Sequence, residues 1–203
     1  MKPSEIEARS MEIIASELKA ELPEEIRPIV MRVIHATADF SFAEQMRFTP
    51  GVVSAARSIL CDGATIVTDT NMALAGISRS ACARVGADGR CFMADEDVTR
   101  EATERNETRA WISAERAADI QGPKLLVCGN APTFLLSLLR QRDKLKDTVI
   151  IGVPVGFVNV VESKEKLWQS GLPCIVAMGR RGGSTVAAAI VNALLYGIEG
   201  VRS

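Results

Sequence analysis

His35 carries the most readily stated chemistry in this chain, because it is the only histidine among 203 residues. Histidine exchanges protons near neutral pH, so His35 is the first candidate for a general acid or base. The alternative is a histidine that caps or packs the end of a helix. The residue type alone does not decide between these two roles.

Other common sets of catalytic residues are missing from the sequence. The five cysteines form no CxxC pair, and a single histidine does not provide the clustered ligands of a zinc site. The glycine-rich run at 179–184 has neither the GxGxxG nor the GxxxxGK[ST] spacing of nucleotide-binding loops. No serine stands in a GxSxG setting. We therefore expect reduced thiols, no metal held by the chain and no cofactor.

Loops rich in turn residues follow the segments that we expect to be strands. The apolar or β-branched runs that predict strands are 65–68, 90–93, 124–128, 148–152 and 173–178. The loops that follow four of them are 69–71, 129–133, 152–157 and 179–184. Glycine lets a backbone approach a ligand closely, and the N-terminus of a helix offers N–H donors to anions. If these loops meet at the carboxyl edge of a sheet, they form a pocket for anionic ligands.

Helical segments alternate with these strands. The predicted helices are 4–20, 24–35, 52–60, 97–119 with a break near Thr108, 132–145, 162–170 and 184–196. Continuous apolar strands separated by helices are typical of a parallel sheet covered on both faces. We therefore predict one α/β domain over residues 1–203, a three-layer sandwich around a mostly parallel sheet of about five strands.

Composition excludes several classes of partner. Lys and Arg total 24 and Asp and Glu total 25, so the chain lacks the basic surplus of a nucleic-acid binder. The apolar runs are shorter than the roughly 20 residues of a membrane helix. The charged N-terminal segment has no apolar signal core. We expect a cytoplasmic protein that binds neither nucleic acid nor membrane.

Five ordered motifs between residues 5 and 197 carry a resemblance to a known family. They are Arg32–Phe40, Ile66–Ile77, Gly129–Thr133, Ile151–Lys164 and Gly179–Leu194. Together they resemble the precorrin-8X methylmutase family of cobalamin biosynthesis, including its cobalt-precorrin branch. Five motifs in the same order are much more specific than any one of them.

The resemblance implies an isomerase. Members of this family move a methyl group from C-11 to C-12 of a corrin-type ring by a [1,5]-sigmatropic shift, which gives hydrogenobyrinate or cobyrinate. They have a three-layer α/β fold and act as homodimers on a corrinoid substrate. The family's active histidine, which exchanges a proton with a ring nitrogen, corresponds to His35. Its substrate contacts correspond to Ser10, Arg32 and Arg109.

The chain departs from the family pattern at one of these contacts. Thr108-Arg109-Ala110-Trp111 stands where the family has Thr-Arg-Ser-Ala, so the arginine is kept and a tryptophan is added. We add Asn130 and Arg180, from two of the loops after strands, to the predicted substrate contacts. Arginine suits this role because its planar guanidinium binds carboxylates through two hydrogen bonds, and the family's substrate carries many carboxylates.

Two alternatives remain from the sequence. One is a non-catalytic tetrapyrrole carrier, which would have no use for the proton of His35. The other is a small anion-binding α/β enzyme that uses Asp39 and Asp69 as acids or bases, although an Asp at the end of a strand is more often a backbone cap. Phe40, Phe42, Phe48 and Met72 are candidates for the surface under a macrocycle, although such residues more often pack in a core.

Overall fold

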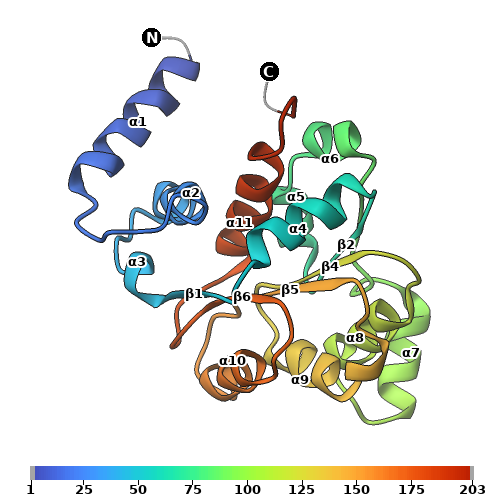
Figure 1. Cartoon of the computed structure of the whole chain (residues 1–203). Helices are drawn as coiled ribbons and strands as arrows, with labels where there is room; N and C mark the ends of the chain where they lie inside the picture. The colour runs from blue at the N-terminus through green and yellow to red at the C-terminus, as the bar shows by residue number, and fades with distance from the viewer. Residues whose placement is uncertain (1–2, 202–203) are drawn as a thin grey trace.

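The sheet lies at the centre of the molecule between two layers of helices (Figure 1). A computed structural model describes residues 3–201, with side chains from residue 5 onward. Within that range the sheet has six strands in the order β1-β6-β5-β4-β2-β3. The strands are β1 (Met46–Phe48), β2 (Thr65–Thr68), β3 (Asp88–Arg90), β4 (Lys124–Cys128), β5 (Thr148–Gly152) and β6 (Cys174–Ala177). All neighbours pair in parallel except β1, which runs antiparallel to β6. The predicted α/β sandwich with a mostly parallel sheet is confirmed, with one strand more than expected.

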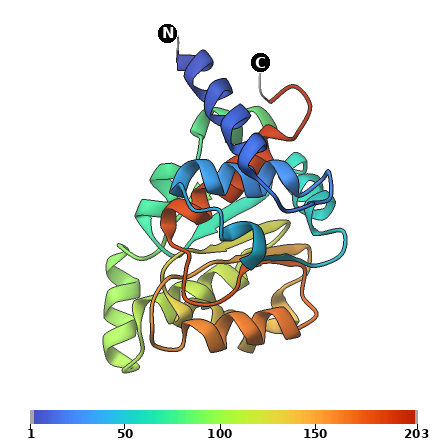
Figure 2. The same ribbon diagram turned by 90° about the vertical axis from the view of Figure 1, so that its left-hand side faces the viewer.

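Two groups of helices cover the two faces of the sheet. One face packs against α2 (Arg27–Thr37), α4 (Val52–Cys61), α5 (Asn71–Gly76), α6 (Arg79–Val85) and α11 (Ser184–Tyr196), with α1 (Pro3–Glu17) against α2. The other packs against α8 (Arg109–Asp119), α9 (Pro132–Arg140) and α10 (Val160–Gln169), with α7 (Glu96–Glu104) against α8. Figure 2 shows α2 and α11 above the sheet and α10 below it. No helix in the described range is long and apolar enough to cross a bilayer.

The inner strands are mostly apolar because both of their faces are covered, and the polar residues Thr68, Lys124 and Thr148 among them are buried as well. Successive side chains of a strand point to opposite faces. In β4, Leu125 and Val127 belong to the core under α2 and α11, whereas Leu126 and Cys128 belong to the core over α8 and α9. This double burial explains why the continuous apolar runs predicted the inner strands correctly.

The shortest elements differ from the predictions. β1 and three helices, α3 (Phe42–Gln45), α5 and α6, were not expected, and β3 ends at Arg90 where a strand was expected to begin. The short helices are held by local caps, since the side chain of Ser78 accepts a hydrogen bond from Ala81 N at the start of α6. The predicted break near Thr108 is confirmed, because Thr108 caps α8 by accepting from Trp111 N. The predicted helix 132–145 divides into α9 and a short 3-10 turn at Arg142–Lys144.

Candidate functional site

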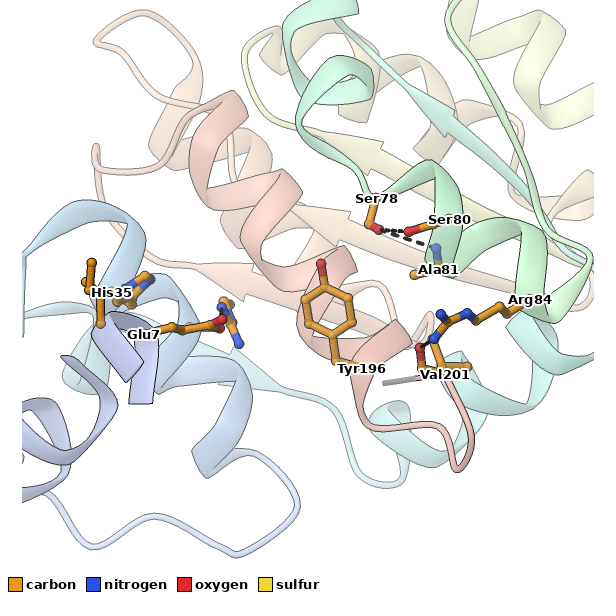
Figure 3. A pocket seen from close by; sticks show the side chains of 10 residues that line it. Glu7, His35, Ser78, Ser80, Ala81, Arg84, Tyr196 and Val201 are labelled. Carbon is orange, nitrogen blue, oxygen red and sulfur yellow. Dashed lines mark hydrogen bonds and ion pairs between the residues drawn. The ribbon is translucent and has the colours of Figure 1, made fainter. Parts of the chain in front are cut away.

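His35 lies in the last turn of α2, on the wall of a cavity of about 640 Å³ (Figure 3). Figure 3 shows His35 and Glu7 on one side of this cavity, Ser80 and Arg84 on the opposite side, and Tyr196 between them. His35 is exposed and makes no hydrogen bond or ion pair with the described residues. Its imidazole is therefore available to exchange a proton with a ligand in the cavity.

Arg32 stands one turn before His35 on α2 and lines the same cavity. Its Nη1 donates to Glu7 Oε1 of α1 at 2.7 Å, and its guanidinium lies 5.4 Å from the centre of the Tyr196 ring of α11. The Arg32 side chain is only 15% exposed. Contacts from two other helices thus hold its position, while its remaining N–H groups have no partner among the described residues and can bind an anion.

A second cavity, of about 240 Å³, adjoins the first at Arg32. Its other lining residues come from α2, α5 and α11: Ala36, Met72, Gly76, Ser184, Thr185, Ala188, Ala189 and Asn192. We call the two cavities together the His35 groove. Met72, on α5, is 72% exposed and forms part of the apolar surface of the groove. Of the candidates for a surface under a macrocycle, Met72 is thus accessible, whereas Phe42 is buried in the core and Phe40 packs against it.

Asn192 is a residue of the groove that sequence reasoning did not single out for a role. Its Oδ1 accepts from the backbone N–H of Ser78 at 2.8 Å, and its Nδ2 donates to the carbonyl of Gly76 at 2.9 Å. These two hydrogen bonds fix the turn between α5 and α6 against α11. Its membership of the last motif marked Asn192 as a candidate. The sequence did not reveal its role because its hydrogen-bond partners lie more than a hundred residues away.

Asp69, at the end of β2, is a buried anchor for the loop after β4. Its carboxylate accepts the backbone N–H groups of Gly129 at 2.8 Å, Asn130 at 2.7 Å and Ala131 at 2.7 Å. Burial raises the pKa of Asp69, and the three backbone donors oppose that rise. Because the side chain has no exposed surface, Asp69 positions this loop and does not reach a ligand.

The loop after β6 is joined to the segment that follows α2. Arg181 Nη1 donates to Asp39 Oδ2 at 2.8 Å and also to the hydroxyl of Ser41. Hydrogen bonds from Ser41 and the charge of Arg181 hold the pKa of Asp39 below its usual range. Neighbouring Arg180 is exposed, and its guanidinium lies 5.4 Å from the centre of the Phe157 ring. Asp39 is thus committed to a structural ion pair.

The remaining predicted contacts lie outside the His35 groove of this single chain. Ser10, on α1, donates to the carbonyl of Ile6 at 2.9 Å, one turn from the groove. Arg109 begins α8 below the sheet and donates to the carbonyl of Met93 at 3.2 Å. Asn130 and Arg180 stand exposed on two loops at the carboxyl edge of the sheet. The structure therefore brings His35 and Arg32 together but keeps Arg109 apart from them.

Trp111, the departure from the family pattern beside Arg109, has a structural role. Its indole N–H donates to Glu115 Oε1 at 2.9 Å, and the guanidinium of Arg140 lies 4.8 Å from the centre of its ring. The first contact lies within α8, and the second ties α8 to α9. The added tryptophan therefore leaves the exposed side chain of Arg109 unobstructed at the start of the helix.

The fold and the groove define a three-layer α/β enzyme whose site offers one proton-exchanging side chain and a held guanidinium. Residues 5–197 match the family model of precorrin-8X methylmutase. The chain belongs to this family, whose members are isomerases of cobalamin biosynthesis.

Curated relatives and a solved structure agree with this assignment. The chain is 41% identical to a cobalt-precorrin-8 methylmutase of Salmonella typhimurium, over 96% of this chain and 95% of that one. It is 40% identical to a precorrin-8X methylmutase of Pseudomonas aeruginosa, over 86% of each chain. Its fold is similar to the structure of the precorrin-8X methyl mutase of Thermus thermophilus, with a TM-score of 0.88, 34% identity and 95% of both chains covered.

Proposed function

We propose that this chain moves a methyl group from C-11 to C-12 of the macrocycle of precorrin-8X or cobalt-precorrin-8, giving hydrogenobyrinate or cobyrinate. The observation that carries the proposal is the placement of an exposed His35, without a partner among the described residues, beside Arg32 in the groove. The shift is intramolecular, so substrate and product have the same atoms and no oxidant or reductant is consumed.

His35 acts as the proton donor and acceptor. The imidazolium gives its proton to a nitrogen of the ring, which makes the conjugated system more electron-poor and promotes migration of the methyl group. The neutral imidazole then takes the proton back. General acid–base catalysis of this kind contributes about 10²- to 10⁴-fold, and orientation of the ring in the groove supplies a further part of the rate.

Arg32 binds an acidic side arm of the macrocycle. Its free N–H groups face a ligand that carries many carboxylates, and a charge-assisted hydrogen bond of this type is stronger than a neutral one. We propose further contacts beyond the groove from Ser10 on α1 and from Asn130 and Arg180 on the loops at the carboxyl edge of the sheet. The surroundings of His35 thus hold the ligand by its periphery and leave the ring nitrogens to the imidazole.

A second copy of the chain completes the site in this proposal. Arg109 lies below the sheet, apart from the groove of its own chain, yet the family pattern places it among the substrate contacts. A homodimer in which Arg109 of one chain faces the groove of the other would bring Arg109 to the substrate despite its distance from the groove of its own chain. We further propose that the enzyme works in the cytoplasm.

The test is a binding measurement followed by a turnover measurement. Purified protein is mixed with hydrogenobyrinic acid and passed through gel filtration, and we expect colour to co-elute at one ligand per site. We then expect His35→Ala to abolish methyl migration and to bind hydrogenobyrinic acid within about threefold of the wild type. The exposed Lys166→Ala serves as a control for both measurements.

Each outcome separates the proposal from its alternatives. Wild-type turnover by His35→Ala would refute the proton-transfer role. Wild-type protein that binds the ligand but never turns over substrate would indicate a carrier. Protein that binds neither hydrogenobyrinic acid nor cobyrinic acid would favour another anion-binding α/β enzyme.

A further inference from the structure

Lys164 is a buried cation whose partners are backbone carbonyls of the loop after β6. It lies on α10 with 0% exposure. Its Nζ donates to the carbonyl of Gly179 at 2.9 Å and to the carbonyl of Arg181 at 2.7 Å. Burying an ammonium group is costly unless its hydrogen bonds are made, and here they are made to a single loop. The side chain therefore connects α10 to the loop that carries Arg180 and Arg181.

Among the described residues, no carboxylate forms an ion pair with Lys164 that would explain its burial. Burial lowers the pKa of Lys164 to about 8, and the Cys128 thiol of β4 acts on it in the opposite direction. Burial also raises the pKa of Cys128, so the thiol stays neutral. The charge of Lys164 is thus directed at the loop carbonyls.

The same loop is held on its other side by backbone contacts to the loop after β5. Gly156 N donates to the carbonyl of Arg180 at 3.1 Å, and Gly183 N donates to the carbonyl of Val153 at 2.9 Å. Gly182 has a φ of +157°, and a Cβ there would lie 2.1 Å from the carbonyl oxygen of Val153. These anchors and the lack of room for a side chain at Gly182 restrict the path of the loop backbone. The hydrogen bonds from Lys164 hold the loop on the side of α10.

The loop 179–183 orients the guanidinium groups of Arg180 and Arg181 in two different directions. Arg181 reaches Asp39 just beyond α2, the helix of His35. Arg180 points outward over Phe157, whose ring is 81% exposed. Both directions depend on the path of the backbone between Gly179 and Gly183.

We propose that Lys164 is a positioning residue for substrate binding, which acts by fixing the loop 179–183 so that Arg180 meets an acidic arm of the corrinoid. The inference rests on the proposed function and deepens it. Lys164 itself touches no substrate, because it lies beneath the loop. Its contribution is the same for the bound substrate and for the transition state, so its loss raises KM and leaves kcat nearly unchanged.

The test compares four proteins: the wild type, Lys164→Met, Arg180→Ala and the double variant. Methionine has a similar length but no donor, so Lys164→Met removes both hydrogen bonds to the loop. We expect Lys164→Met to raise the Kd for hydrogenobyrinic acid and the KM for precorrin-8X about tenfold, with kcat within about threefold. In the Arg180→Ala background the same change has a much smaller effect, because the side chain that the loop positions is already gone.

Lys166→Met is the matched control, since Lys166 is exposed on the same helix and its side chain makes no hydrogen bond or ion pair with the described residues. It should leave Kd, KM and kcat unchanged. Circular dichroism verifies that each variant is folded. If Lys164→Met does not fold, Lys164→Gln, which keeps an uncharged NH₂ donor group on a shorter side chain, is measured in its place with a smaller shift expected in the same direction.

Three results would overturn the inference: a folded Lys164→Met that binds as the wild type does, effects of Lys164→Met and Arg180→Ala that simply add, or a loss of kcat at constant KM. Failure of both Lys164 variants to fold would also overturn it, in favour of a purely structural role. A wild type that binds no corrinoid refutes the proposed substrate instead. Failure of the inference and failure of the proposed function are therefore distinguishable.

Discussion

Arg181 donates to Asp39 across 2.8 Å, and this contact joins the loop after β6 to the chain four residues beyond His35. The two residues stand 142 positions apart in the sequence. Through this pair, the end of the histidine-bearing helix and the loop with the arginine pair have a common support. We therefore expect Asp39 to support the site and to take no part in proton transfer.

Replacing Asp39 should have little effect on catalysis. We expect Asp39→Ala to lower the free energy of unfolding by about 1 kcal/mol or less, because the pair is largely solvent-exposed. Since the pKa of Asp39 is lowered in the fold, its contribution is present above its ordinary pKa of 3.8 and is lost as pH falls below it. Turnover measured at neutral pH should stay within a few-fold of wild type. A loss of a hundredfold or more, about the contribution of a general acid or base, would show that Asp39 is catalytic.

Arg32 and Glu7 should have opposite effects on ligand affinity. Arg32→Gln removes the guanidinium that we propose binds a carboxylate, so the Kd for hydrogenobyrinic acid should rise about 10- to 100-fold. Glu7→Gln removes the acidic group that competes for Arg32 in the same cavity, so the Kd should stay the same or fall. Titration by visible absorption measures both. Equal weakening by the two changes would mean that the pair matters only as a structural link.

Asp69→Asn should destabilise the protein strongly. The side-chain amide cannot accept all three backbone N–H groups of residues 129–131 and turns a donor toward some of them. We expect a loss of about 2 to 4 kcal/mol in the free energy of unfolding, measured with urea. The exposed Asp62→Asn is the control and should change stability by less than about 0.5 kcal/mol. A fully stable Asp69→Asn without activity would restore Asp69 as a candidate acid.

Lys164 should make the stability of the protein depend on alkaline pH. Its pKa is 10.5 in the ordinary state and about 8 in the fold. Between these values the unfolded chain binds more protons than the folded chain, so the free energy of unfolding rises with pH. Relative to Lys164→Met, the wild type should gain up to about 3 kcal/mol from about pH 7 to about pH 10.5. Urea unfolding across this range measures the difference. Parallel curves for the two proteins would show that the pKa of Lys164 is the same in the folded and the unfolded chain, which would contradict the lowering by burial.

Much of the architecture was predictable from local sequence. The runs at 65–68, 124–128 and 148–152 form β2, β4 and β5 with the expected bounds, because strands buried on both faces are rich in apolar and β-branched residues. The break at Thr108 followed from its capping chemistry. The ordered motifs likewise indicated the family that the comparisons show. The single domain over residues 1–203 and the roles of the site residues stay predictions.

The edge of the sheet was not predictable in the same way. β1 has only three residues, and its pairing with β6 joins Met46 to Ala177. β3 is exposed at all of its positions, so no apolar run marks it. Such strands form because they pair with an outer strand of the sheet, β1 with β6 and β3 with β2. Local composition does not predict that pairing.

The sequence by itself determined which chemical groups the chain offers. They are one histidine, arginines that we predict bind acidic arms of the substrate, and loops that follow apolar strands. Only the tertiary structure decided which of these groups meet. It placed Glu7 and Tyr196 around Arg32, enclosed Lys164 under the loop 179–183, and kept Arg109 apart from His35. The physical reason is that periodicity and capping act over a few residues, whereas these contacts arise when helices distant in sequence pack on the same face of one sheet.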